Sequence, residues 1–303
     1  MKYNVAAIVV GYHPEEDILL DLLTSLSSQV QVVVLVDNGD SKNTYNKALK
    51  NKLNIQYCEL GENKGLGYAL NAGFGIAAAL GLKYVATFDQ DSAPDEHMIS
   101  ALIKAHEELT LSDNTVAAVG PRYFDRREDN KVYAPFYREE NGCIKYLNNE
   151  LDSQKYVQVD MLITSGMLIL TEVWISGLKY DESVFIDYTD PEWCFRARSL
   201  GYKIFGCLDI EMPHAASNSP PFRIFGLTFF RYSPLRRYYY FRNTLYFCKL
   251  WYVSSAWKKR LLGGVLIRII VNLLIDEDKF KSFTMMMLGL KHGLKNKSGK
   301  FTF

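Results

Sequence analysis

Two aspartates separated by a single residue, Asp89 and Asp91, directly follow an apolar, β-prone run from Tyr84 to Phe88. Their oxygens project from one face of a continuing strand, or converge where the chain turns at a strand end. Such oxygens suit Mg²⁺ or Mn²⁺, ions that share their coordination positions among water, one or two carboxylates and substrate phosphates. The pair therefore predicts a divalent metal with a nucleotide as co-ligand. The alternative is an ordinary polar loop, and the surrounding sequence has to decide between the two.

Strands and helices alternate on the N-terminal side of this pair. The predicted elements are strands at 5–10, 32–36 and 84–88, with helices at 17–26 and 68–80. Continuous apolar strands are typical of a parallel sheet that is buried on both faces. Ligands of such open α/β sheets bind beyond the carboxyl ends of the strands. We therefore expect the loops at 11–14, 37–40 and 89–92 to meet in one crevice.

Less regular sequence follows. We expect a helix at 94–109, a strand at 115–119, a polar, Tyr-rich excursion at 120–159 that helps to cover the site, and one interrupted strand at 158–169. The interruption is Ser165-Gly166, and a glycine inside a strand often marks a bulge or a close approach of backbone to ligand. A helix is predicted from about Asp190 to Leu200. Pro191 suits its first turn, and Asp190 could serve simply as its N-cap.

Composition excludes several classes of protein. With 48% hydrophobic and 23% charged residues, the chain is expected to be globular rather than disordered. Five scattered cysteines without metal-ligand spacing suit the reduced thiols of a cytoplasmic protein, and no signal peptide is recognised. The glycine loop at 61–67 matches neither a Walker loop nor the dinucleotide fingerprint. A nicotinamide-dependent enzyme is therefore disfavoured.

Charge divides the chain into two parts. Residues 219–303 contain 16 Lys and Arg against three acids, a net charge of 16 − 3 = +13. Residues 1–218 contain 19 Lys and Arg against 31 acids, a net charge of 19 − 31 = −12. The basic part is rich in aromatic and aliphatic residues and predicts amphipathic helices at 222–232, 238–253 and 261–275 that lie on an anionic membrane surface. The longest run, 261–275, is too short to span a bilayer. The alternative is that these aromatics pack on the rest of the chain. No nucleic-acid-binding motif accompanies the basic residues, so no nucleic acid is expected.

Six segments in chain order match one set of motifs. They are the strand and turn at 9–14, the strand end Asp37-Asn38-Gly39, the Asn-x-Gly-x-Gly-x-Ala-x-Asn-x-Gly pattern at Asn63, Gly65, Gly67, Ala69, Asn71 and Gly73, the Asp89/Asp91 pair, the acidic helix start at 189–192 and the aromatic Arg-Asn segment at 237–243. Across residues 4–245 the chain resembles the family 2 inverting glycosyltransferases, most closely the bacterial L-rhamnosyltransferases. The resemblance implies the GT-A fold, a Rossmann-like open mixed sheet flanked by helices, here with a helical, basic, amphipathic C-terminal extension.

The chain departs from the family pattern at the acidic helix start. Thr189 stands where the family usually has Glu, and Glu192 where it has Asp. By resemblance the catalytic base lies here, and Asp190 is our choice, because the dipole at a helix start favours the ionised state that a general base requires. Asp187 and Glu192 remain alternatives for the base. Trp193 is expected on the acceptor side.

The resemblance also assigns the metal. In the family the second aspartate is generally the direct ligand, which implies that Asp91 binds Mg²⁺ or Mn²⁺ and that Asp89 lies nearer the ribose or an outer-shell water. His214, in a loop after Met212-Pro213, is a further candidate ligand.

The donor implied by the resemblance is a nucleotide sugar whose base meets Asp37. That carboxylate could accept the imide hydrogen of uracil or of thymine, so it cannot separate UDP from dTDP, and the rhamnosyltransferase resemblance alone favours dTDP-β-L-rhamnose. The residues assigned to the donor are Tyr12, Pro14, Asp37, Asn38, Asn63, Gly65, Gly67, Asn71, Asp89, Gln90, Ser165, Gly166, Arg237 and Arg242.

The predicted activity is inverting transfer of L-rhamnose to a hydroxyl of a saccharide acceptor, expected to be lipid-linked, in the synthesis of a cell-surface polysaccharide such as an O-antigen. Two alternatives stay open: a transferase that uses a UDP-hexose or UDP-N-acetylhexosamine, and a non-catalytic nucleotide-sugar-binding subunit of an assembly complex.

Residues 1–218 would form the catalytic domain, and residues 219–303 a region that faces a membrane or a partner. The expected location is the inner face of the cytoplasmic membrane, with a homodimer as an alternative use of the apolar C-terminal part.

Overall fold

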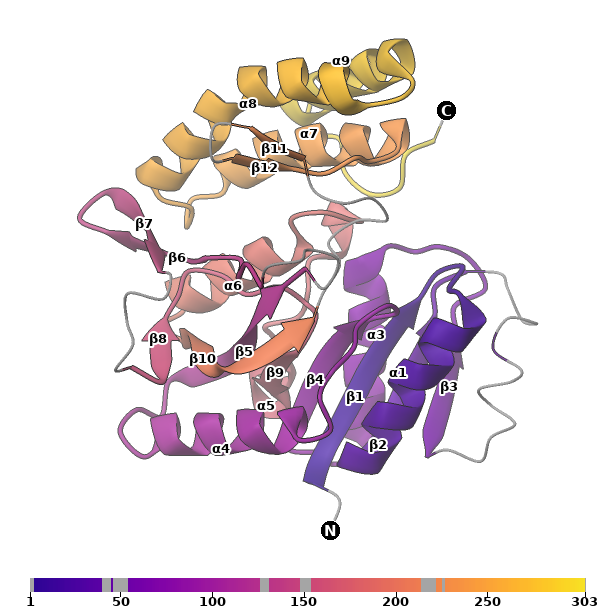
Figure 1. Ribbon diagram of the computed structural model, residues 1–303, viewed down its shortest axis with the longest axis vertical. Helices are drawn as coiled ribbons and strands as arrows, with labels where there is room; N and C mark the ends of the chain where they lie inside the picture. Colours follow the sequence, from indigo (N-terminus) through magenta and orange to yellow (C-terminus); the bar gives the residue numbers. More distant parts are fainter. Residues whose placement is uncertain are drawn as a thin grey trace.

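An eight-stranded sheet lies at the centre of the part of the chain that the structure describes. The computed structural model describes residues 3–39, 45, 54–125, 131–147, 154–213, 222–224 and 227–302. The strands of this sheet, in spatial order, are β3 (Ile55–Glu59), β2 (Val30–Asp37), β1 (Tyr3–Gly11), β4 (Tyr84–Asp89), β9 (Met167–Leu170), β5 (Val116–Phe124), β10 (Lys203–Pro213) and β8 (Tyr156–Gln158) (Figure 1). The pairs β3-β2, β2-β1, β1-β4 and β5-β10 are parallel, whereas β9 and β8 run antiparallel to their neighbours. This open mixed sheet confirms the predicted fold class.

Helices cover both faces of the sheet. They are α1 (Glu16–Gln29), α3 (Leu66–Ala79), α4 (Met98–Thr110), α5 (Thr171–Ile175) and α6 (Thr189–Ser199). Apolar side chains of α1 and α4 form one core cluster with Val5 and Val9 of β1. Those of α3 and α6 form the other cluster with Ala6 and Ile8. Because neither face meets water, the central strands are continuously apolar instead of alternating.

Two predictions of local structure were wrong. Residues 158–169 are not one interrupted strand, because β8 ends at the sheet edge and β9 lies between β4 and β5, with a turn through Gly166 (φ +81°) leading into β9. The described residues of 222–232 form no helix: β11 (Phe222–Ile224) and β12 (Leu227–Phe229) pair antiparallel. Gly226 interrupts that apolar run, and glycine disfavours a helix interior.

The segment predicted to be irregular, 120–159, contains regular structure. It holds the end of β5 and a hairpin of β6 (Phe136–Glu140) and β7 (Cys143–Leu147). The hairpin lies between the sheet and the C-terminal helices in Figure 1. Tyr137 of β6 packs edge-on against Trp257 of the C-terminal region, so this excursion joins the two parts of the chain.

Three helices form the C-terminal part and lie together at the top of Figure 1. They are α7 (Pro234–Lys249), α8 (Ser255–Ile275) and α9 (Lys279–Leu294). Ser233 and Ser254 cap the first two, each accepting a hydrogen bond from a backbone N–H of the first turn. Inside the bundle, Arg237 and Asp276 form a buried two-point ion pair with N···O distances of 2.6 and 2.9 Å.

Buried aromatic clusters join these helices to the sheet part. Tyr238 and Tyr239 of α7 and Met285 of α9 pack with Phe185, which precedes α6. Phe247 and Trp257 pack with Phe195 of α6. The C-terminal aromatics therefore pack largely on the rest of the chain, although α8 keeps an exposed apolar side. Among the described helices, none is both long enough and apolar enough to cross a membrane.

Candidate active site

Strand register brings the three predicted loops to one edge of the sheet. Gly11 pairs with Asp37 where β1 and β2 end, and Val10 pairs with Asp89 where β4 ends. Because these strands are parallel, their loops leave on the same side, the upper edge in Figure 1 that faces the C-terminal helices. The backbone N–H of Tyr12 donates to Oε1 of Gln90 at 2.6 Å, which ties the first loop to the third.

The turn that enters β9 holds the first aspartate of the metal pair. Ser165 is fully buried, and its hydroxyl donates to Oδ2 of Asp89 at 2.6 Å. The same hydroxyl lies 3.0 Å from that of Ser92. The N–H of Gly166 donates to the carbonyl of Thr87 in β4, which fixes this turn on the strand that carries Asp89. Asp89 is therefore oriented before any ligand arrives.

The residue before Ser165 holds a second carboxylate. Thr164 donates its backbone N–H to Oδ2 of Asp190 at 3.0 Å and its hydroxyl to Oδ1. Asp190 is partly buried, and the loss of water raises its pKa to about 7. The two hydrogen bonds from Thr164 oppose that rise, and the nearby charges of Asp89 and Asp187 add to it. A carboxyl with such a pKa can exchange a proton near neutral pH.

The alternative that Asp190 serves simply as the N-cap of the helix does not hold. Helix α6 begins one residue earlier, at Thr189, and its N-cap position is Tyr188, whose side chain makes no capping hydrogen bond. Asp190 lies in the first turn, and its carboxylate is directed to Thr164 instead of the helix's own N–H groups. Capping therefore does not account for the presence of Asp190.

Strained backbone precedes the helix. Phe185, Asp187 and Tyr188 all have left-handed φ angles of 58° to 69°, which cost free energy in residues with a β-carbon. Oδ1 of Asp187 accepts from Nε of Arg236 at 3.3 Å, whereas its buried Oδ2 has no hydrogen-bond partner among the described residues. Burial raises the pKa of Asp187, and Arg236 opposes the rise. Asp187 thus presents an oxygen that can still accept a hydrogen bond.

Helix α7 holds this strained segment in place. Nδ2 of Asn243 lies within hydrogen-bond distance of the carbonyls of Val184, Ile186 and Asp187, at 2.9, 2.7 and 3.1 Å. Arg242, which is 1% exposed, donates to the carbonyl of Val184 as well. The Arg-Asn segment therefore acts on the site through the backbone that carries Asp187.

The Asn-Gly pattern supports the same segment from the other side. A β-carbon on Gly65 (φ +92°) would lie 2.7 Å from the carbonyl oxygen of Phe185, and one on Gly67 would lie 2.8 Å from that of Asp181. The side chain of Asn71 accepts from the N–H of Tyr180 and donates to its carbonyl oxygen. These residues lie against the chain's own backbone at 180–185.

At the end of β2, Asp37 is completely buried. Its carboxylate accepts from the N–H of Gly39 at 3.0 Å and from the hydroxyls of Tyr45 and Tyr57 at 3.1 and 2.8 Å. The negative charge of Asp37 and burial together raise the pKa of both tyrosines. Asn38 bonds to Asn63 and to the N–H of Lys64, which links this strand end to the Asn-Gly loop. Pro14 is buried, whereas Tyr12 is 47% exposed beside the same edge.

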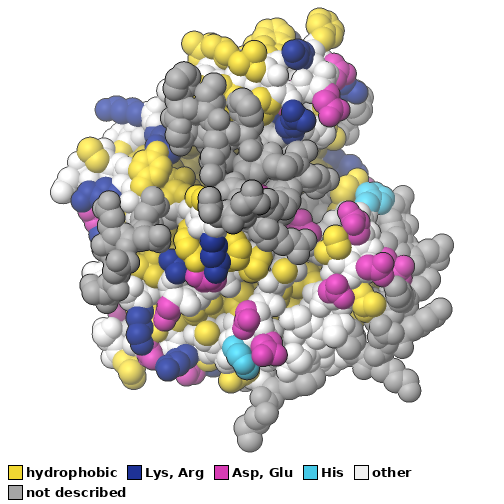
Figure 2. Space-filling model, in the orientation of Figure 1, with side chains coloured by type: hydrophobic (Ala, Val, Ile, Leu, Met, Phe, Trp, Pro, Cys, Tyr) yellow, Lys and Arg dark blue, Asp and Glu magenta, His cyan; other side chains and the backbone are white. Residues whose placement is uncertain are grey.

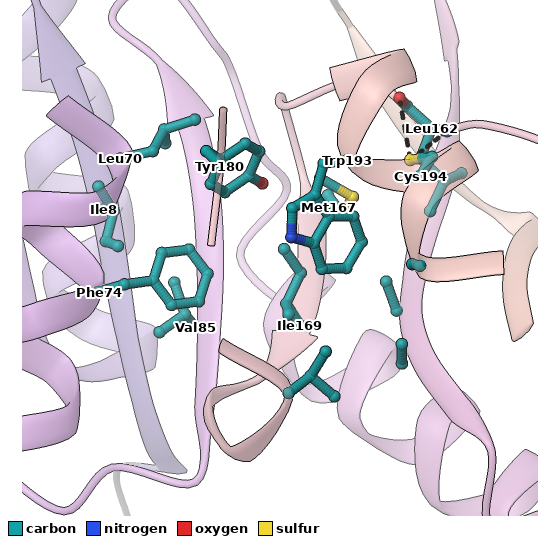
Figure 3. Close-up of a cluster of buried hydrophobic side chains, with 14 of the residues drawn as sticks. Ile8, Leu70, Phe74, Val85, Leu162, Met167, Ile169, Tyr180, Trp193 and Cys194 are labelled. Carbon is teal, nitrogen blue, oxygen red and sulfur yellow. Dashed lines mark hydrogen bonds between the residues drawn. The ribbon is translucent and has the colours of Figure 1, made fainter. Parts of the chain in front are cut away.

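Several predicted site residues lie elsewhere. The carboxylate of Glu192 is buried against Arg196, at 2.7 and 3.0 Å, and Tyr252. Trp193 lies in the core below α6, where Figure 3 shows it beside Tyr180 and Met167. Arg237 pairs with Asp276 inside the C-terminal bundle. His214 lies outside the residues that the structure describes.

The donor set at the end of β4 fits a small divalent ion. Asp89 and Asp91 are both partly exposed at the ligand edge of the sheet. Within the described residues no third His, Cys, Asp or Glu completes a metal cluster with them. Two carboxylates that leave the other positions to water and a diphosphate are the arrangement expected for Mg²⁺.

Sequence reasoning missed two residues of this site, Thr164 and Arg236. The negative charge of Asp187, with a smaller contribution from that of Asp89, raises the pKa of Arg236, and Nε of Arg236 donates to Oδ1 of Asp187. An Arg-Arg pair in the first turn of α7 was a visible signal, but the sequence does not say which of the two faces the sheet. Thr164 had no signal, because threonine before Ser-Gly is common in turns.

Comparisons with known proteins agree with this geometry. Residues 7–163 match the family described as glycosyl transferase family 2. The chain is similar to the dTDP-rhamnosyl transferase RfbF of Shigella flexneri, 28% identical over 303 residues that cover 99% of this chain and 98% of the relative.

Two solved structures share the fold. Staphylococcus aureus TarS 1-349 in complex with UDP-GlcNAc has a TM-score of 0.54 at 17% identity, covering 98% of this chain and 82% of that one. GalNAc-T7 with UDP, GalNAc and Mn²⁺ has a TM-score of 0.62 at 13% identity, covering 97% and 57%. These likenesses confirm the GT-A fold. The family match spans more than half of the 303 residues, and the protein belongs to glycosyl transferase family 2.

Proposed function

We propose that this glycosyltransferase moves L-rhamnose from dTDP-β-L-rhamnose to a hydroxyl of a saccharide acceptor, with inversion at the anomeric carbon. One observation carries the proposal: the consecutive residues Thr164 and Ser165 hold Asp190 and Asp89, one carboxylate for the acceptor proton and one for the leaving-group side. Inversion by single displacement needs two separate groups, because the base and the leaving diphosphate lie on opposite sides of the sugar. The full-length similarity to a dTDP-rhamnosyl transferase supports rhamnose as the sugar.

Asp190 is the proposed base. In its ionised form it takes the proton from the acceptor hydroxyl, the acceptor oxygen forms its bond to the anomeric carbon, and the bond from that carbon to the diphosphate oxygen breaks. The electron pair of the broken bond leaves with the dTDP. A pKa of about 7 keeps a substantial ionised fraction at neutral pH while leaving the carboxylate basic enough to accept a proton.

Asp91 and Asp89 are the proposed holders of Mg²⁺ or Mn²⁺, with His214 as a further candidate from sequence. When bound, the metal would supply positive charge for the developing diphosphate. Arg236 supplies a positive charge that is hydrogen-bonded to Asp187, and we assign it to the same negative leaving group. Its guanidinium lies over the ring of Tyr232, 4.0 Å from the ring centroid, which limits its movement.

Asp37 is the proposed contact of the nucleobase. A carboxylate has about four acceptor positions, and the described residues donate three hydrogen bonds to that of Asp37; we assign a further position to the imide hydrogen of a pyrimidine. The exposed ring of Tyr12 lies at the same edge and can pack on the base.

A panel of nucleotide sugars tests the proposal. Transfer and slow donor hydrolysis are measured with dTDP-rhamnose, dTDP-glucose, UDP-glucose and UDP-N-acetylglucosamine, each with and without Mn²⁺. We expect dTDP-rhamnose to be used and dTDP-glucose, which shares its nucleotide, to be used poorly. Preference for a UDP-hexose would favour the second candidate sugar class. Tight binding without transfer or hydrolysis of any donor would favour a non-catalytic subunit.

The C-terminal part is proposed to lie on an anionic membrane. Leu262, Leu266, Ile270 and Leu274 form an exposed stripe at every fourth residue of α8. Lys258 and Lys259 stand near the start of the same helix. Figure 2 shows hydrophobic side chains with nearby cations at the top of the molecule, over the C-terminal helices. An apolar stripe beside basic residues is the pattern of interfacial membrane helices.

A further inference from the structure

A pocket lined by aromatic side chains lies next to Asp187, between α6 and the C-terminal helices. Its volume is about 270 Å³, and Tyr188, Tyr240 and Trp257 contribute rings to its wall. Pockets for drug-sized ligands hold about 300–1,000 Å³, so this one suits a single sugar ring. We call it the aromatic pocket.

Asp187 gives this pocket a polar end. It belongs to the lining, and its buried Oδ2 has no hydrogen-bond partner within the described residues. A buried carboxylate oxygen without a donor costs free energy unless a ligand supplies one. Sugar hydroxyls are such donors, and aromatic rings offer the flat apolar faces on which sugar rings stack. Asp190 itself does not line the pocket, but the next residue, Pro191, does, so the pocket reaches the first turn of α6 that carries the proposed base.

Two arginines of α8, Arg260 and Arg268, line the same pocket. The guanidinium of Arg260 lies over Tyr146 and that of Arg268 over Tyr240, 5.0 and 5.2 Å from the ring centroids. Within the described part of the chain, neither has a carboxylate or a hydrogen-bond acceptor. Nearby arginines differ: Arg196 pairs with Glu192, Arg198 with Asp160 and Arg237 with Asp276. Two guanidinium groups whose planar N–H donors are not used by the described residues are suited to a bound anion.

We propose that the aromatic pocket binds the acceptor, and that Arg260 and Arg268 bind a negatively charged group attached to the acceptor sugar. The sugar ring lies between the aromatic side chains with its reactive hydroxyl toward Asp187 and Asp190, and the anion lies at the α8 side. The inference rests on the proposed transferase function and adds the chemistry of the acceptor. The anion is either a diphosphate that links the sugar to a lipid or the carboxylate of an acidic sugar.

The test compares two double variants. Arg260→Gln/Arg268→Gln removes both arginines of the pocket, and Lys258→Gln/Lys259→Gln removes two charges from the same helix outside the pocket. Binding of three compounds is measured by calorimetry without donor: a saccharide linked to an alkyl diphosphate, the same saccharide as a neutral alkyl glycoside, and its uronic acid analogue. Thermal melting checks that each variant is folded.

The arginine variant is expected to lose about tenfold to hundredfold in affinity for one anionic compound and to bind the neutral glycoside as the unchanged protein does. Which anionic compound loses affinity identifies the source of the charge. Equal losses for charged and neutral compounds, an equal loss in the lysine variant, or no loss at all would overturn the proposal. Donor binding and hydrolysis, measured separately, show whether the proposed function itself has failed.

Discussion

Thr164 donates both its backbone N–H and its hydroxyl to the carboxylate of Asp190. The next residue, Ser165, donates its hydroxyl to Asp89. Neighbouring residues of one turn thus orient two carboxylates that lie 101 residues apart in the sequence, 190 − 89. Two hydrogen bonds hold this turn on β4: the N–H of Gly166 donates to the carbonyl of Thr87, and the hydroxyl of Thr87 donates to the carbonyl of Thr164. This arrangement fixes the spacing between the acceptor side and the leaving-group side of the site, and it leads to the first two predictions.

Asp190→Asn should strongly lower transfer while leaving donor binding nearly intact. The amide can replace the carboxylate without new strain, because its oxygen can accept from the N–H of Thr164 and its NH₂ group can donate to the Thr164 hydroxyl. General base catalysis contributes about 10²- to 10⁴-fold, so kcat should fall by about that factor. Steady-state transfer assays and donor calorimetry measure the two effects. Asp187→Asn is the comparison variant, and an active Asp190→Asn enzyme would move the base to Asp187.

Thr164→Val should move the pH dependence of the reaction. A base with a pKa of about 7 is protonated below that pH, so kcat/KM should rise with pH and level off above about 7. The hydrogen bonds from Thr164 favour the ionised carboxylate and lower its pKa. Removing the hydroxyl therefore raises the pKa, and the rising limb should shift to higher pH.

Thr164→Ser is the matched control, because serine keeps the hydroxyl donor. Its pH profile should stay near that of the unchanged protein. A profile that is the same in the valine, serine and unchanged proteins would show that the rising limb belongs to another group.

Helix rotation explains which site residues could be predicted from sequence. The motif order placed Asp190 and Asp89 at the ligand edge, because the carboxyl ends of parallel strands and the start of the following helix are recognisable in sequence. Glu192 is two residues beyond Asp190, about 200° further around α6, and residues at that spacing do not face each other. It therefore meets Arg196 and Tyr252 on another side of the helix.

The same limit applies to the start of α7. Arg236 and Arg237 are adjacent and differ by about 100° in direction, so one faces Asp187 and the other Asp276. By sequence alone, Arg237 is assigned to the nucleotide-sugar donor. Choosing between the two arginines requires knowledge of how α7 packs, which no local pattern provides. The strained turn at 185–188 was likewise hidden, because left-handed Phe185 and Tyr188 are held there by Asn243 and Arg242, far along the chain.

Gly67→Ala should lower both stability and activity. Its added β-carbon would lie 2.8 Å from the backbone oxygen of Asp181, and backbone moves less readily than a side chain. Such overpacking costs about 1–3 kcal/mol, and a shift at Asp181 would carry the Asp187 segment with it. Gly263→Ala in α8 is the control, since a β-carbon there meets nothing within 4 Å. Alanine should stabilise that helix by up to about 1 kcal/mol. Denaturant unfolding and transfer assays should separate the two variants, and equal behaviour would contradict the close contact.

Leu266→Gln/Ile270→Gln should weaken binding to anionic lipid vesicles. These side chains are 66% and 53% exposed, and both lie on the apolar stripe of α8. Full burial of one such side chain contributes about 1.5–3 kcal/mol, so partial burial of two should account for at least about a tenfold change in vesicle affinity. Leu111→Gln/Leu200→Gln is the matched control, because these leucines are 90% and 61% exposed but lie outside the C-terminal helices.

Vesicle flotation at low and high salt measures the effect, and salt should weaken binding because the basic residues contribute to it. The membrane surface would be misplaced if the control pair lost as much binding as the α8 pair, or if neither pair lost any.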